Sequence, residues 1–120
     1  MNKLITLLLN FYFKVKDLHY KALNEGRLGD HAFLDTITDG VMGDIDDIQE
    51  VVNGIKGDFA KTEDIIEKVD GNCYDILLRI TDLLEDIVEN KGQTDGTINL
   101  MNSLSQKYQH FYSFLRKYKE

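Results

Sequence analysis

The sequence predicts an all-α protein, a bundle of four helices, from three observations. The 120 residues include no proline, which is common in loops and at sheet edges and is excluded from helix interiors. Apolar residues recur every three or four positions through four long segments, which is the period of a helix. No segment alternates apolar and polar residues in the way that predicts a strand. We therefore expect a single domain over residues 1–120, large enough to bury a core of its own.

The first helix is expected from Asn2 to about Asn24. Its apolar stripe consists of Leu4, Leu8, Phe11, Val15, Leu18 and Ala22. The run from Leu4 to Phe13 is apolar on nearly every face, so we expect this part of the helix to be buried on two sides. The run is shorter than the ~20 apolar residues that span a bilayer, and no cleavage site with small residues follows it. We expect a cytoplasmic protein with no membrane segment.

The second helix is expected from Asp30 to about Lys56, after a turn at residues 25–29. Asp30 is predicted as its N-cap. Gly57 is predicted to end it, because glycine commonly follows the last helical residue. The apolar positions of this helix are Leu34, Ile37, Val41, Ile45, Ile48 and Val52.

The third segment allows two interpretations. One helical phase is kept by Thr62, Ile66, Val69, Cys73, Leu77, Ile80, Leu84 and Ile87. Gly71 and Asn72 nevertheless form a breaker signal in its middle, so the segment is either one long helix or a short helix followed by a longer one. The fourth helix is expected from Thr94 or Asp95 to Tyr118. Its inward positions are Ile98, Met101, Leu104, Tyr108, Phe111, Tyr112 and Leu115.

The composition argues against several kinds of function. The 14 basic and 21 acidic side chains give a net charge of −7, which argues against a surface that binds DNA. The one cysteine, Cys73, forms no internal disulfide and is predicted as a small core residue. The sequence has no nucleophile triad, glycine-rich phosphate loop or CxxC pair.

Candidate chemistry lies on the second helix. At ~100° per residue, an acidic stripe lies about 130° from the apolar one. Its members are His31, Asp35, Asp39, Asp46 and Glu50. His31 with Asp35, and Asp46 with Glu50, have the four-residue spacing that places two side chains on one face. The two pairs lie about 22 Å apart along one helix, so they cannot bind the same ion within one chain.

A two-fold axis would remove this difficulty. The midpoint of His31 and Glu50 falls between residues 40 and 41, and so does the midpoint of Asp35 and Asp46. Packing this helix antiparallel against its copy would place the first pair of one chain opposite the second pair of the other. Gly40 and Gly43 lie where such a crossing needs a close approach of the backbones. The pattern predicts a homodimer through this helix.

His19 on the first helix completes the candidate set, because it lies close to the edge where that helix could meet the same interface. Two imidazoles and three carboxylates suit Fe(II), Mn(II) or Zn(II). Each part also has a plainer interpretation. His31 with Asp35 can be an exposed ion pair, and His19 a core histidine. A solvated acidic face would account for Asp39, Asp44, Asp46, Asp47 and Glu50. The joint spacing favours the metal site.

Residues 18–57 also carry a family resemblance. The LHY triplet, the GDHAFLD run and the DIDDIQE run resemble the Dps family of ferritin-like mini-ferritins. That family has a histidine in an LHW-like triplet, a second histidine twelve residues on, an aspartate four residues later, and then a DxxxE motif. Five residues stand at those spacings: His19, His31, Asp35, Asp46 and Glu50.

The resemblance implies a ferritin-like bundle with a ferroxidase site shared by two subunits. His19, His31 and Asp35 would come from one subunit, and Asp46 and Glu50 from the other. The implied activity is oxidation of Fe(II) to Fe(III) by peroxide or dioxygen, for iron storage or detoxification, in a homodimer or a dodecamer.

The chain also departs from the family pattern. Tyr20 replaces the usual tryptophan, only about fifteen residues from Gly57 to Asn72 connect the second and third helices, and we expect no basic N-terminal extension of the kind that many relatives use on DNA. Two alternatives therefore stay open. One is a plain antiparallel bundle, and the other is a non-catalytic helical interaction protein that binds a protein or a small ligand.

Overall fold

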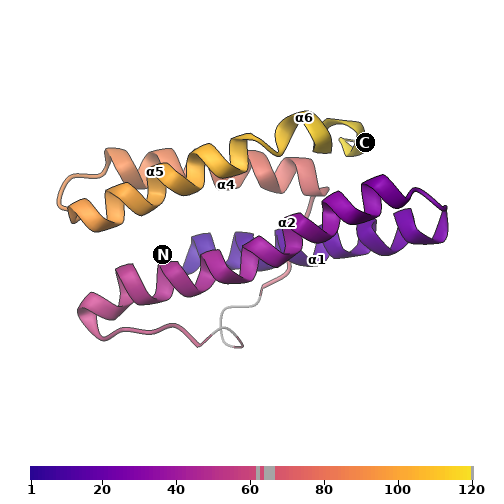
Figure 1. Cartoon of the computed structure of the whole chain (residues 1–120). Coiled ribbons are helices and arrows are strands. Elements are labelled where there is room, and N and C mark those ends of the chain that lie inside the picture. The colour runs from indigo at the N-terminus through magenta and orange to yellow at the C-terminus, as the bar shows by residue number, and fades with distance from the viewer. Residues whose placement is uncertain (62, 64–66, 120) are drawn as a thin grey trace.

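The protein consists of helices joined by turns and one long connection (Figure 1). The computed structural model describes residues 1–61, 63 and 67–119, and this part of the chain contains no strand. The four long helices are α1 (Asn2–Asn24), α2 (Leu28–Ile48), α4 (Cys73–Glu89) and α5 (Asp95–Gln109). The prediction of an all-α protein with four helices is confirmed.

Shorter helical turns extend α2 and α5. A π-helical turn (Gln49–Asn53) and a 3-10 turn (Gly54–Lys56) continue α2 to Gly57, whose φ of 65° ends the helix as predicted. The fourth helix, in contrast, is not continuous. α5 ends at Gln109, and α6 (Tyr112–Leu115) and a 3-10 turn (Arg116–Tyr118) follow.

The connection between α2 and α4 runs from one end of the bundle to the other. Figure 1 shows α1 and α5 running in one direction and α2 and α4 in the opposite one. The end of α4, at Asn90, lies near the start of α1 and near Asn53, whereas its start, at Cys73, lies near Lys21. The helices that precede and follow the connection are therefore parallel, and a plain up-and-down antiparallel bundle is ruled out.

Two side chains fasten this connection to the helices. The Asn10 side chain of α1 donates to the carbonyl of Glu67 at 2.6 Å and accepts from the amide of Val69 at 2.8 Å. Gln49 donates to the carbonyl of Ala60 at 2.7 Å and accepts from the amide of the same residue at 3.1 Å. Both side chains satisfy backbone groups that no helix provides for, and they attach these two parts of the connection to the bundle.

The core lies around α1, which contacts both α2 and α4. The first part of α1 is buried on two sides, as predicted, because the neighbouring residues Leu7, Leu8 and Leu9 are all at most 5 % exposed. The predicted stripe of α2 is buried from Leu34 to Ile48 and half-buried at Val52. Cys73 is buried, as expected.

Two predicted helix starts need comment. Asp30 is not an N-cap. α2 begins earlier, with Arg27 as its N-cap, and the Asp30 carboxylate instead accepts hydrogen bonds from Arg27, Lys117 and Tyr118. These bonds attach the start of α2 to the end of the chain.

The breaker signal before α4 is a helix start. Gly71 has a φ of 112°, a region that glycine adopts readily, and the Asn72 side chain caps α4 in a reciprocal capping box with Asp75. A single long helix through this point is therefore wrong. Thr62 and Ile66, which suggested it, lie outside the described residues. No helix in the described part of the chain is long and apolar enough to span a bilayer.

Candidate functional site

Three of the five predicted site residues lie together where α1 and α2 face each other. His19 of α1 is 7 % exposed, and its ring stacks on that of His31 with centroids 3.9 Å apart and an angle of 30° between the planes. The Asp35 carboxylate, one turn further along α2, lies 3.9 Å from His19 Nδ1. We call these three residues the histidine cluster.

A hydrogen bond to the backbone determines the orientation of the His19 ring. His19 Nδ1 lies 3.2 Å from the carbonyl oxygen of His31. A carbonyl oxygen can only accept, so Nδ1 is the donor and carries a proton. In the neutral ring the lone pair is then on Nε2, which is the arrangement by which a backbone carbonyl orients a metal-ligating histidine.

A lysine already approaches the open side of the histidine cluster. Lys16 Nζ lies 3.6 Å from Asp35 Oδ1, and it also lies 5.7 Å from the centre of the Tyr20 ring. The Asp35 side chain is 45 % exposed, and neither Lys16 Nζ nor His19 Nδ1 is within normal hydrogen-bond distance of its carboxylate. Its carboxylate therefore has lone pairs available to a further cation. The sequence contains a signal for this contact, since Lys16 lies three residues before His19 and so shares its face of the helix.

The other two predicted residues do not join the cluster within one chain. Asp46 lies further along α2 and Glu50 lies in the π-helical turn that follows it, and both side chains are exposed. In the described residues, no group of three or more His, Cys, Asp or Glu side chains is placed to hold a metal ion. A complete five-residue site therefore requires a second copy of the chain, as the spacing argument stated.

The prediction of a solvated acidic face is wrong at Asp44. This residue is 5 % exposed, and its carboxylate accepts two bonds from Lys107 Nζ, at 2.8 and 2.9 Å, and one from the Tyr108 hydroxyl at 2.7 Å. We call these three residues the aspartate centre. Burial, reinforced by the Asp44 charge, raises the pKa of Tyr108 above its ordinary value, so its hydroxyl stays a donor.

The spacing of Asp44 could have indicated its position. Ile37, Val41 and Ile48 form the inner stripe of α2, and Asp44 lies on the same stripe at the intervals of three and four. A charge at such a position predicts a buried partner. Asp39, Asp46, Asp47 and Glu50 are exposed, in agreement with the solvated interpretation.

The two glycines of α2 have different surroundings. A Cβ at Gly40 would lie 3.1 Å from Lys107 Nζ, so glycine at this position lets the lysine reach Asp44 across the helix. The contact between Lys107 and Asp44 therefore explains glycine at position 40 within one chain, without the dimer crossing that was expected to require it. A Cβ at Gly43 would have no atom within 4 Å, and nothing among the described residues requires glycine there.

Large apolar side chains are exposed on the same two helices. Phe13, Tyr20 and Leu23 of α1 are each at least 50 % exposed, and Met42 of α2 is 46 % exposed. Tyr20 contacts His19 edge to face, with ring centroids 5.2 Å apart. Tyr20 is therefore an exposed apolar side chain that lies directly beside the histidine cluster, as in a surface that another molecule covers.

Cys73 has no place in this chemistry. It lies at the start of α4, and burial raises the pKa of its thiol to about 11. The thiol is therefore almost entirely protonated at neutral pH and is a poor metal ligand or nucleophile.

Comparisons with known proteins identify no relative of this chain: no protein-family model, curated protein or solved structure matches it.

Proposed function

We propose that the protein is a subunit of a mini-ferritin that oxidises Fe(II), its substrate, at a site shared by two copies. The observation that carries the proposal is the histidine cluster. Residues twelve and sixteen positions apart from His19 meet at one place on two helices, with a lone pair on His19 Nε2 and an exposed carboxylate on Asp35. Imidazole nitrogen together with carboxylate oxygen is a donor set suited to iron.

The exposed face of α2 supports the sharing of the site. Asp46 and Glu50 are exposed, and the symmetry of their spacing places them opposite the histidine cluster of a copy packed antiparallel. The exposed apolar side chains Tyr20 and Met42 provide area for such a contact. Open space at Gly43 allows a second backbone to approach α2 closely.

The topology also supports the proposal. Four-helix bundles in which one long connection makes the second and third helices parallel include the ferritin-like folds. Here about fifteen residues, from Gly57 to Asn72, link the two parallel helices α2 and α4. The short connection that separates the chain from the Dps pattern is therefore compatible with a ferritin-like order of helix directions.

The proposed reaction needs little from the protein beyond ligand geometry. Each Fe(II) gives up one electron, and one hydrogen peroxide takes two electrons and two protons to become two molecules of water. His19 and His31 supply nitrogen ligands, and Asp35 with the second copy's carboxylates supplies negative charge that stabilises the more highly charged product. Lys16 competes with the incoming cation for Asp35 until iron displaces it.

The test is complementation between two inactive variants. We expect His31→Ala and Asp46→Ala each to abolish the faster appearance of ferric absorbance on mixing Fe(II) with peroxide. Unfolding the two variants together and refolding them would give mixed dimers in which one of the two shared sites is intact. Random pairing then restores about one quarter of the wild-type activity.

His110→Ala and Asp47→Ala are the matched controls, because both side chains are exposed and lie outside the proposed site. Full activity of His31→Ala, or no recovery in the refolded mixture, would contradict the shared site.

The second candidate is a non-catalytic helical interaction protein. The contact of Lys16 with Asp35 favours it, because the cluster then has a cation of its own and the exposed apolar side chains serve a protein partner. Elemental analysis of protein purified from iron-replete cells separates the two: stoichiometric iron supports the mini-ferritin, and its absence supports the interaction protein.

A further inference from the structure

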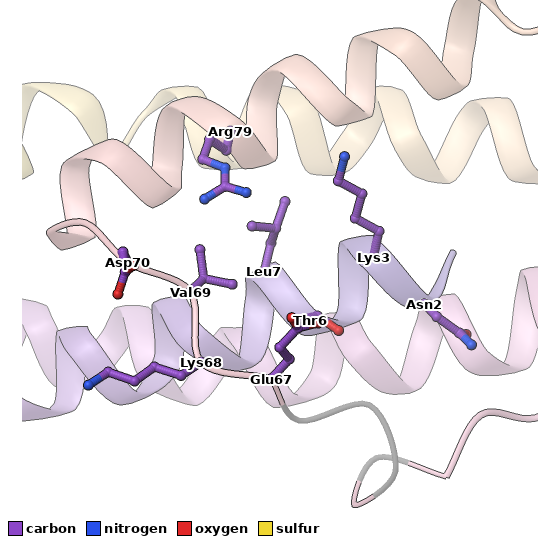
Figure 2. A pocket seen from close by; sticks show the side chains of 9 residues that line it. All are labelled: Asn2, Lys3, Thr6, Leu7, Glu67, Lys68, Val69, Asp70 and Arg79. Carbon is purple, nitrogen blue, oxygen red and sulfur yellow. The ribbon is translucent and has the colours of Figure 1, made fainter.

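A cavity of about 600 Å³ lies at the opposite end of α1 from the histidine cluster, between the first turns of α1, the middle of α4 and the last part of the connection before α4 (Figure 2). Its volume is in the range of small-molecule sites. Asn10 holds the backbone of Glu67 and Val69 against α1, so one wall of the cavity is fixed in place by hydrogen bonds.

Two cationic side chains border this cavity. Lys3 comes from α1 and Arg79 from α4, and both are exposed. Within the described part of the chain neither forms an ion pair. Figure 2 shows them on either side of Leu7, with the Arg79 guanidinium directed into the cavity. In a chain with a net charge of −7, two free cations at one cavity are a local exception.

The apolar part of the lining comes from Val69, which is half-buried and packs against the core, whereas Leu7 between the two cations is 2 % exposed. Lys3 and Arg79 come from different helices, so each can bind a separate acidic group while a short carbon chain contacts Val69. Arg79 can hold a carboxylate through two parallel hydrogen bonds, and Lys3 provides a point charge.

Three further charges lie at the rim. Glu67 lies beside Thr6 at the foot of the cavity, and in Figure 2 the Asp70 carboxylate points away from Arg79. Lys68 also points away from the cavity. The carboxylates of Glu67 and Asp70 repel an anionic ligand, so the acidic groups of a ligand must meet Lys3 and Arg79 directly.

We propose that this cavity binds a small organic acid with two or three carboxylates. One carboxylate bonds to the Arg79 guanidinium and a second to the Lys3 ammonium, and the carbon chain contacts Val69. Inorganic phosphate has one charged centre and no apolar part, so it cannot make the same set of contacts. The proposal goes beyond iron oxidation and does not depend on it.

The experiment is titration calorimetry of the whole protein with succinate and with citrate, at constant ionic strength. We expect Arg79→Gln to weaken binding about tenfold and Lys3→Gln several-fold, because each removes a charge-assisted hydrogen bond. Lys68→Gln is the matched control: it makes the same change of charge on a side chain that points away, and we expect its affinity to stay within about twofold of the wild type. Backbone amide NMR shifts at Leu7 and Val69 on adding succinate locate the ligand.

Three results would overturn the proposal. The first is equal weakening by Lys68→Gln, which would mean general attraction to positive charge. The second is equal affinity for inorganic phosphate or acetate, which would mean that the cavity does not recognise two carboxylates. The third is no heat and no shift at ~10 mM succinate.

Discussion

Two carboxylates on α2, nine residues apart, have opposite surroundings. In the aspartate centre, Asp44 is 8 % exposed at its side chain and accepts three hydrogen bonds of 2.7 to 2.9 Å from within the chain. In the histidine cluster, Asp35 is 45 % exposed, with Lys16 Nζ at 3.6 Å and His19 Nδ1 at 3.9 Å. The Asp44 carboxylate is fully hydrogen-bonded within the chain, whereas the groups nearest to the Asp35 carboxylate lie beyond normal hydrogen-bond distance.

The difference in surroundings indicates that Asp44 stabilises the fold, whereas Asp35 is available to bind a ligand. A buried carboxylate that has all its partners connects α2 to α5 and leaves nothing for a ligand. A half-exposed carboxylate beside two imidazoles contributes little to stability and keeps lone pairs for a cation from outside. The following predictions test this distinction, beginning with the largest expected effect.

We expect Asp44→Ala to lower the free energy of unfolding by about 3 kcal/mol, because it leaves the buried Tyr108 hydroxyl and the Lys107 ammonium without their acceptor. Asp35→Ala is the comparison, with an expected change within about 0.5 kcal/mol. Urea denaturation of both variants measures the contrast. Equal losses would mean that Asp35 also has a structural role.

Replacing the two glycines of α2 tests the same contrast along the helix. We expect Gly43→Ala to raise the free energy of unfolding of the isolated subunit by about 1 kcal/mol, because alanine favours a helix and the space is open. Gly40→Ala gains the same propensity but moves Lys107 away from Asp44, so we expect it to be no more stable than the wild type. Thermal unfolding at low protein concentration compares them. Greater stability of Gly40→Ala would mean that Lys107 moves at no cost.

Removal of the lysine that approaches the open carboxylate is expected to improve cation binding. We expect Lys16→Gln to tighten Zn(II) binding about threefold, the effect of removing one exposed charge beside the ligand. Lys14→Gln makes the same change of charge two residues away and serves as control. Calorimetry with Zn(II) measures both affinities, and equal gains in the two variants would show that only net charge matters.

Asp30 is a carboxylate that has several hydrogen-bond partners but lies at the partly exposed start of α2. It therefore separates the effect of hydrogen bonding on stability from the effect of burial. The Lys117 ammonium, with help from Arg27 and Tyr118, holds the pKa of Asp30 below its ordinary value. A lowered pKa in the folded state means that the carboxylate stabilises the protein above the unfolded pKa of about 4 and stops doing so as the pH falls through the folded value.

We therefore expect Asp30→Asn to lower Tm slightly at pH 7, the smallest of these effects, and the difference from wild type to disappear in acid. Melting curves from neutral to acidic pH at low salt measure it. A difference that persists at the acidic end would assign the effect to packing rather than to charge.

The sequence alone predicts the parts of this fold that local physics decides. The ends of α1 follow from the spacing of its apolar residues, and the stop at Gly57 follows from glycine at a helix end. His19 contacts His31, in agreement with the expectation that His19 lies at the edge of the first helix that faces the second. The direction of α4 could not be predicted, because helical periodicity is the same for either direction. The partners of Asp44 lie 63 and 64 residues away along the chain, so no local pattern reveals them.

The hydrogen bonds between Asn10 and the connection before α4 affect how the protein opens locally and in what order it folds. Because the Val69 amide donates to Asn10, which is 9 % exposed, we expect this amide to exchange with solvent deuterium as slowly as helical amides, although it lies outside any helix. The α1–α2 and α4–α5 hairpins can each form from nearby residues, whereas the bond to Asn10 joins positions 59 residues apart. Protection at Val69 would therefore report when the two hairpins dock, and its loss would be the first sign that they separate.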